Sequence, residues 1–254
     1  MSFEACAGIV ERGDPERFLA IMAAPVPARR VLFPIIAFNV EVARAPWVTQ
    51  EPMIAEMRLQ WWRDALDEIA EGKEVRKHEV TTPLAEVLTP QQARDLDRLV
   101  AARRWDVYTA PFEDAAHFEE YLQATAADLM VVCAQALGDA SAEVVRGFGW
   151  GVGLANWLRA VPDLEARGRV PMVDGRPEAV QLLAQRGLAL IREARARRAA
   201  VSSQAGPALL MGWQAERILR RAAAQPKAVL NGTLSPSPAR AKLGLMIAAA
   251  TGRW

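Results

Sequence analysis

The sequence contains few of the residues that build disulfide frameworks and metal centres, with two cysteines and two histidines among 254 residues. Cys6 and Cys133 are too few for a disulfide framework or a zinc site, so we expect both thiols to be reduced, as in a cytosol. His78 and His117 have no cysteine or aspartate at metal-ligand spacing, and we expect both to be solvated. The composition therefore argues against a disulfide-stabilised or zinc-dependent protein.

Long apolar runs and strand-like alternation are also scarce. No apolar run reaches the roughly 20 residues that a membrane-spanning helix needs. The first 18 residues carry four acidic side chains, whereas signal peptides have an apolar core and transit peptides are poor in acids, so we expect no targeting segment. Alanine, leucine and arginine dominate instead, which predicts an all-α fold and a single domain over residues 1–254.

Charge is nearly balanced overall, at +1, but it is separated along the chain. Residues 1–175 contain 18 Lys/Arg and 27 Asp/Glu, a net −9, whereas residues 176–254 contain 13 and 3, a net +10. This basic C-terminal third either faces an anionic lipid surface or an acidic partner, or covers the acidic first part of the chain. The basic run 192–198 has no stacking aromatic beside it, so we expect no nucleic-acid partner.

Helix-start signals and apolar periodicity predict a chain of helices. Asp14 and Pro15 resemble an N-cap followed by a proline in the first turn. The glycine-rich stretch 147–153 follows no strand, so we interpret it as a face that lets other helices approach and not as a nucleotide loop. The expected helices are at about 15–22, 28–43, 52–71, 84–88, 90–106, 113–137, 141–160, 177–200, 207–224 and 236–250.

Residues 156–169 read NWLRAVPDLEARGR. This stretch resembles a motif of squalene and phytoene synthases, a helix ending Asn-x-Leu-Arg-Asp-x-x-x-Asp that is followed by Gly-Arg. The asparagine, leucine, arginine and Gly-Arg are present, but Ala160 and Leu164 occupy the places of the two aspartates. Asp163 is displaced by one position from the second of these places, which on a helix rotates it by about 100°.

Two earlier segments resemble the same family. Residues 29–41 read RRVLFPIIAFNVE and residues 58–66 read RLQWWRDAL, which match an Arg-x₇-Ala-Phe helix and an Arg-x-x-x-Trp-Arg-x-x-Leu helix of the family. The enzymes carry their first aspartate-rich motif just after Ala-Phe, where this chain offers Glu41 alone. Small residues after Tyr121, at 125–127, resemble a helix that lets the prenyl chain approach, although close helix packing explains them equally well.

The matches run in order over residues 14–172 and imply a single-domain isoprenoid-synthase-type fold around a central cavity. Members of this family ionise an allylic diphosphate with Mg²⁺ ions, which prefer carboxylate oxygens in near-octahedral geometry. With Glu41 and Asp163 as the remaining acidic residues near the motif positions, we expect no metal and no cofactor. The acidic pair Asp64 and Glu68 flanks an apolar helix stripe, and we expect it to be solvated.

More narrowly, the sequence resembles the branch of this family that contains an assembly factor of respiratory complex I and its bacterial relatives. That resemblance implies a non-catalytic assembly or lipid- or isoprenoid-binding protein with a respiratory-complex partner, cytoplasmic and peripheral at the inner face of the membrane. The alternative is a prenyl-diphosphate transferase whose degenerate site binds Mg²⁺ through Glu41 and Asp163, with Glu165 as a further candidate ligand. The ligand-binding candidates are Phe38, Asn39, Arg58, Trp62, Tyr121, Asn156, Arg159 and Arg169. For Asn156 and Arg159 a purely structural role, as helix cap and ion-pair partner, is an equal alternative.

Overall fold

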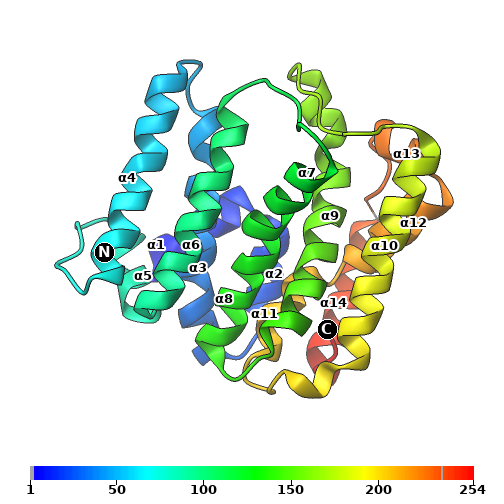
Figure 1. Cartoon of the computed structure of the whole chain (residues 1–254). Coiled ribbons are helices and arrows are strands. Elements are labelled where there is room, and N and C mark those ends of the chain that lie inside the picture. The colour runs from blue at the N-terminus through cyan, green and yellow to red at the C-terminus, as the bar shows by residue number, and fades with distance from the viewer. Residues whose placement is uncertain (1–2, 236) are drawn as a thin grey trace.

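The computed structural model describes residues 3–235 and 237–254, and within these ranges the chain is built of helices joined by loops (Figure 1). The long helices are α1 (Phe3–Gly13), α2 (Pro15–Ala23), α3 (Val26–Arg44), α4 (Pro52–Ala70), α6 (Pro90–Ala102), α8 (Asp128–Leu137), α9 (Ala142–Ala166), α10 (Pro177–Ala196), α12 (Ala215–Ala224) and α14 (Pro238–Thr251). The shorter ones are η1 (Ala45–Trp47), α5 (Thr81–Val87), η2 (Arg103–Val107), α7 (Ala115–Leu122), η3 (Gln123–Ala127), η4 (Arg198–Ala200), α11 (Gly206–Leu209), η5 (Leu210–Gly212) and α13 (Lys227–Leu230). The predicted all-α class is confirmed.

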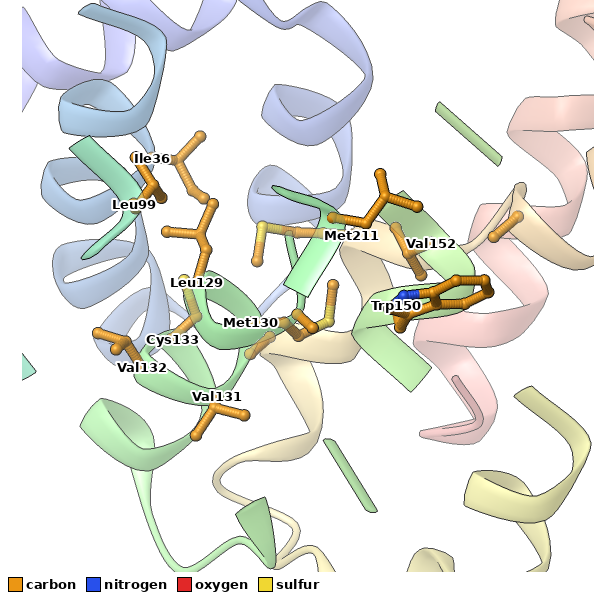
Figure 2. Packing of buried hydrophobic residues seen from close by; sticks show 14 of the residues in the cluster. Ile36, Leu99, Leu129, Met130, Val131, Val132, Cys133, Trp150, Val152 and Met211 are labelled. Atoms are coloured by element: carbon orange, nitrogen blue, oxygen red, sulfur yellow. The ribbon is translucent and has the colours of Figure 1, made fainter. Parts of the chain in front are cut away.

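The helices form two groups that share a core. In the first group α1 packs on α3, and α4 packs on α6; in the second, α9 packs on both α8 and α10 (Figure 1). Helix α8 also contacts α3 and α6, so it joins the two groups. Figure 2 shows how Ile36 of α3, Leu99 of α6 and Leu129 of α8 point toward one another at this junction.

The buried core includes both cysteines. Cys6 and Cys133 have no exposed surface and form no disulfide. Burial raises the pKa of each thiol to about 12, so both remain protonated thiols near neutral pH. The expectation that the cysteines are reduced agrees with this state.

Helix α9 approaches its neighbours through glycines, as the stretch 147–153 predicts. A Cβ atom at Gly149 would lie 2.9 Å from Ala127 Cα, and one at Gly151 would lie 3.0 Å from the carbonyl oxygen of Gly187. A Cβ atom at Gly153 would lie 2.5 Å from Ala126 Cβ. These three positions therefore bring α8, α10 and η3 closer to α9 than any side chain would allow.

Several helix boundaries differ from those predicted. Helix α1 was not predicted, because its apolar stripe ends at the Gly13-Asp14-Pro15 break and is short. The predicted helix 113–137 is divided by η3, a π-helical turn in which Thr125 Oγ1 donates a hydrogen bond to the Tyr121 carbonyl at 2.6 Å. The predicted helix 207–224 is divided into α11, η5 and α12. The last helix begins at Pro238, and Pro236, within its predicted range, lies outside the described residues.

The predicted start of α2 is confirmed. Asp14 caps α2 by accepting a hydrogen bond from Arg17 N at 3.0 Å, with Pro15 in the first turn. Pro34 lies within α3, which continues past it to Arg44.

Across the described ranges, none of the helices has the length and apolar character that crossing a membrane requires.

The glycine contacts of α9 generate a stability prediction. Gly149→Ala forces a methyl group against the backbone of Ala127, so we expect the free energy of unfolding to fall by about 1–3 kcal/mol. Gly147→Ala, two residues away on the same helix, places its methyl 4.0 Å from Leu190 Cδ2 and should raise the free energy of unfolding by about 0.5–1 kcal/mol. Urea denaturation measures both, and equal effects would contradict the proposed close approach.

Candidate functional site

A cavity of about 340 Å³ lies between the C-terminal half of α9, the end of α3 with η1, and α7 with η3. Its lining combines an aromatic wall with several charged groups. The lining residues are Arg17, Ala43, Trp47, Arg103, Asp106, Tyr121, Leu122, Thr125, Ala126, Gly153, Asn156, Trp157, Ala160, Asp163, Leu164 and Arg167. We call this space the central cavity.

Ala160 and Leu164, where the resemblance to the family would place aspartates, face the central cavity. Ala160 and Leu164 line it from α9, one helical turn apart, and Ala43 lines it from α3. Trp47 of η1 follows Ala43 by one turn and adds an indole ring to the same wall. Where two facing carboxylate pairs would be needed to hold a metal cluster, the chain therefore presents apolar side chains.

Glu41 lies at a different site. It lines a second cavity of about 500 Å³, together with Arg58, Trp62 and His78. Glu41 and Ala43 are two positions apart on α3, which turns them to nearly opposite faces of the helix. The structure therefore places Glu41 and Asp163 in different cavities. The two carboxylates do not share the single metal site that the prenyl-diphosphate transferase alternative would need.

The carboxylates of the central cavity do not fit a Mg²⁺ cluster. Asp163 is exposed on α9, and Asp106 is buried and engaged by other side chains. In the part of the chain that the structure describes, no three His, Cys, Asp or Glu side chains are grouped so that they could hold a metal ion. Mg²⁺ needs oxygen ligands in near-octahedral geometry, which these residues do not supply.

A buried polar network forms the floor of the central cavity. Arg103 Nη1 donates hydrogen bonds to Tyr121 Oη at 2.6 Å and to Asp106 Oδ2 at 3.0 Å. The Tyr121 hydroxyl donates in turn to Asp106 at 3.0 Å. Burial raises the pKa of Tyr121 well above its usual range, so its phenol stays neutral. The network therefore fixes one charged pair and one neutral hydroxyl beside the aromatic wall.

Arg169 supports this floor from outside the cavity. It is buried, donates hydrogen bonds to the backbone carbonyl oxygens of Trp105 and Asp106, and lies over the rings of Trp47 and Trp105 at 5.2 and 5.4 Å. Desolvation lowers the pKa of its guanidinium. Arg169 thus holds η2 in position and does not line the cavity.

The remaining candidates are divided between several places. Tyr121 and Asn156 line the central cavity, whereas Arg58 and Trp62 line the second cavity. Phe38 is fully buried and packs edge-on against Trp62, with ring centroids 5.5 Å apart. Asn39 is buried too, and its Oδ1 atom has no hydrogen-bond partner.

Arg159 forms an ion pair and does not line the central cavity. Its Nη1 and Nη2 atoms donate to the two carboxylate oxygens of Glu16 on α2, at 2.6 and 2.9 Å. Arg159 therefore has the structural role of an ion-pair partner, and the carboxylate that it contacts lies at the start of α2. The pair joins α9 to α2 across a large separation in sequence.

Two expectations about polar residues need correction. His78 is not freely solvated: it is half-buried, and its ring meets Trp61 and Trp62 edge-on at 5.2 and 5.5 Å. Glu68 is not a free solvated carboxylate, because Arg76 donates hydrogen bonds to both of its oxygens. These hydrogen bonds lower the pKa of Glu68.

Sequence reasoning did not identify Arg17, Arg103, Asp106 or Arg167. Arg17 and Arg167 reach the cavity from α2 and from just after α9, and the Arg167 guanidinium lies 4.9 Å from the Trp47 ring centroid. The spacing of Arg103 and Asp106 was the available signal, since residues three apart face each other on a helix. The site therefore offers three guanidinium groups, an amide and an aromatic wall, a set suited to an anionic or polar head group on an apolar chain.

The buried network predicts a stability effect. Asp106→Asn removes the charge that Arg103 and Tyr121 share, so we expect the free energy of unfolding to fall by about 2–3 kcal/mol. Asp174→Asn, which breaks an exposed ion pair with Arg176, should leave the urea midpoint unchanged. If both variants unfold at the wild-type urea concentration, the network does not stabilise the fold.

Comparison with known proteins identifies a family and several relatives that this chain resembles. A family model described as "Squalene/phytoene synthase" matches residues 10–172. Over 178 residues the chain is 34% identical to the Drosophila melanogaster "NADH dehydrogenase (ubiquinone) complex I, assembly factor 6 homolog", covering 66% of this chain and 53% of that protein. Over 180 residues it is 26% identical to the assembly factor 6 of Bos taurus, covering 65% and 51%. The chain thus spans about half the length of these curated relatives.

Solved structures show the same fold. A dehydrosqualene synthase crystallised with a ligand superimposes with a TM-score of 0.80 at 16% identity, over 98% of this chain and 95% of that one. A squalene synthase of Alicyclobacillus acidocaldarius gives 0.72 at 18% identity, over 89% and 94%. The predicted isoprenoid-synthase-type helical fold is confirmed by these superpositions. Since the family model matches more than half of its length, the chain belongs to the squalene/phytoene synthase family.

Proposed function

We propose that this protein is a non-catalytic member of its family that acts as an assembly factor for a respiratory NADH dehydrogenase complex. The observation that carries the proposal is the lining of the central cavity, which is apolar at Ala43, Ala160 and Leu164 and whose carboxylates, Asp106 and Asp163, are not grouped to bind a metal cluster. The names of the relatives support it, because the Drosophila melanogaster and Bos taurus proteins are both complex I assembly factors.

The chemistry of the family explains why these positions matter. Ionising an allylic diphosphate develops charge on the leaving group, and Mg²⁺ ions neutralise that charge as Lewis acids. The guanidinium groups of Arg17, Arg103 and Arg167 can bind an anion, but they cannot supply several divalent charges to one diphosphate. Binding without ionisation is the function that this lining supports.

We propose further that the central cavity binds a lipid or isoprenoid. Its volume of about 340 Å³ and its wall of Trp47, Tyr121 and Trp157 suit part of an apolar chain. Asn156 and Arg167 lie among the lining residues and suit a polar head group.

We propose that the protein carries out this assembly role in the cytoplasm, at the inner face of the membrane, beside a subunit of the respiratory complex. The support is the basic C-terminal third, which carries a net +10 over residues 176–254. Cytoplasmic membrane leaflets are anionic and attract basic segments within about 10 Å, the screening length at moderate salt.

Deleting the gene should lower the amount of assembled respiratory complex in the host cell, measured by native gels and by NADH oxidation in isolated membranes. The double variant Glu41→Ala/Asp163→Ala should restore assembly as well as the wild type does, because neither carboxylate contributes to a shared metal site. Purified protein with Mg²⁺ and farnesyl diphosphate should release no more diphosphate than a protein-free blank. Turnover that the double variant abolishes would establish a prenyltransferase with a degenerate site instead.

Filling the central cavity should remove its ligand. Ala160→Phe places a phenyl ring in the space between α9 and the aromatic wall, so we expect a lipid that co-purifies with the wild type to be absent from this variant. Ala166→Phe, at the exposed end of the same helix, is the matched control and should retain the lipid. Native mass spectrometry of gently purified protein gives the readout, and wild-type protein without bound lipid would contradict the ligand site.

A further inference from the structure

Helix α14 is apolar on both faces although it lies at the surface. Ala241 and Leu245 face the core and are buried. On the opposite side Leu243, Met246 and Ile247 are 58%, 68% and 56% exposed. Their spacing of three and four residues puts them in one stripe, which we call the α14 ridge. An outward apolar stripe of this kind is typical of a helix that binds another surface.

The ridge is held in a fixed position on the protein. Helix α14 contacts α2 and η5, and the chain beyond it is anchored at Trp254. The Trp254 carbonyl oxygen accepts a hydrogen bond from Arg195 Nε at 2.8 Å, and its ring meets Phe148 edge-on at 5.0 Å. The three ridge side chains therefore project from a helix that is packed against the core.

The charged residues in the segment that contains the ridge are all basic. Residues 217–254 contain seven Lys/Arg and no Asp/Glu. Lys242 lies one turn before Met246, and Arg217 Nη2 lies 3.8 Å from the Cβ position of Gly244. Lys242, Arg217 and Arg253 are exposed, and within the described ranges none of the three takes part in a salt bridge.

The rest of the basic C-terminal third behaves differently. Two arginines of α10 and its C-terminal end pair with the acidic first part of the chain, Arg186 with Glu119 and Arg197 with Glu143. These contacts fit the interpretation that basic residues cover acidic ones. Beyond Glu216, whose carboxylate is held by Arg195 and Arg220, the sequence has no acidic residue left to neutralise the charge.

We propose that the α14 ridge inserts into the head-group region of an anionic lipid bilayer, while Lys242, Arg217 and Arg253 contact the lipid phosphates. This inference rests on the proposed location at the membrane face and names the helix that makes the contact. A bilayer offers an apolar layer beneath a continuous anionic surface, which matches an apolar ridge with basic flanks. A second copy of the chain would place like charges against one another, which disfavours pairing of two ridges.

A second exposed apolar patch, on α4, differs from the α14 ridge in the charges around it. On α4, Met53, Ile54 and Met57 are 75%, 42% and 66% exposed. Their surroundings are of mixed charge, with Glu51 and Glu56 on the same stretch as Arg58. Glu56 is paired with Arg104 at 2.8 Å, so the charges around the α4 patch give no net attraction to an anionic membrane, and we do not expect the patch to bind it.

The test measures binding of the whole protein to vesicles of phosphatidylcholine alone and of phosphatidylcholine with phosphatidylglycerol in equal parts. Wild-type protein should float with the mixed vesicles, and raising the salt concentration should release it. Each basic side chain near the surface contributes about fivefold to binding, so Lys242→Gln/Arg253→Gln should weaken binding by about 25-fold. Leu243→Ser/Ile247→Ser should weaken it by about tenfold or more.

The matched control removes two other exposed apolar side chains. Met53→Ser/Leu182→Ser changes side chains that are 75% and 67% exposed on α4 and α10, and it should bind as the wild type does. Because all of these side chains are exposed, the variants should keep the wild-type circular dichroism spectrum and melting temperature. A ridge variant that binds less while folding normally supports the proposal.

The outcomes separate this inference from the proposed function. If wild-type protein does not bind the mixed vesicles, both the membrane location and the ridge contact are wrong, while the assembly role is judged by the gene deletion. If the wild type binds and the ridge variant binds equally well, only the assignment to α14 is wrong. If the ridge variant instead converts a dimer to a monomer in sedimentation and vesicle binding is unchanged, the ridge is a self-association surface and the proposal is overturned.

Discussion

The close approach of α9 to its neighbours is the constraint on which the rest of the structure depends. Gly149, Gly151 and Gly153 let the backbones of η3 and α10 and the Met130 side chain of α8 pack closely against α9 along one half of the helix. The helix then continues past this contact to Ala166, and the central cavity lies beside that second half. The same helix therefore closes the core at one end and forms the wall of a cavity at the other.

This arrangement separates the scaffold of the family from its chemistry. A cavity survives because helix packing and the Arg103, Asp106 and Tyr121 network maintain it, and neither depends on bound metal. Apolar side chains at Ala43, Ala160 and Leu164 remove the mutual repulsion that clustered carboxylates would cause in a metal-free site. These apolar side chains line the cavity from both α3 and α9.

Much of the fold could be predicted from the sequence, but less of the site. The helical class and the cavity-facing positions 160 and 164 follow from local pattern and motif spacing. Glu41 lines a different cavity from Ala43, because a shift of two residues reverses the face of a helix. The pairing of Arg159 with Glu16 joins segments 143 residues apart, and the π turn at Thr125 arises from packing, so neither has a local signal.

The two buried thiols have a practical consequence for spectroscopy. Cys6 and Cys133 are shielded from solvent and protonated, so we expect maleimide reagents, which are attacked by thiolates, to leave them unmodified in the folded protein. A cysteine introduced on the surface would then be labelled selectively without first removing the native ones. Fluorescent or spin probes that report depth, distance and orientation can therefore be attached to the wild-type chain at a chosen surface position, without labelling of the native cysteines.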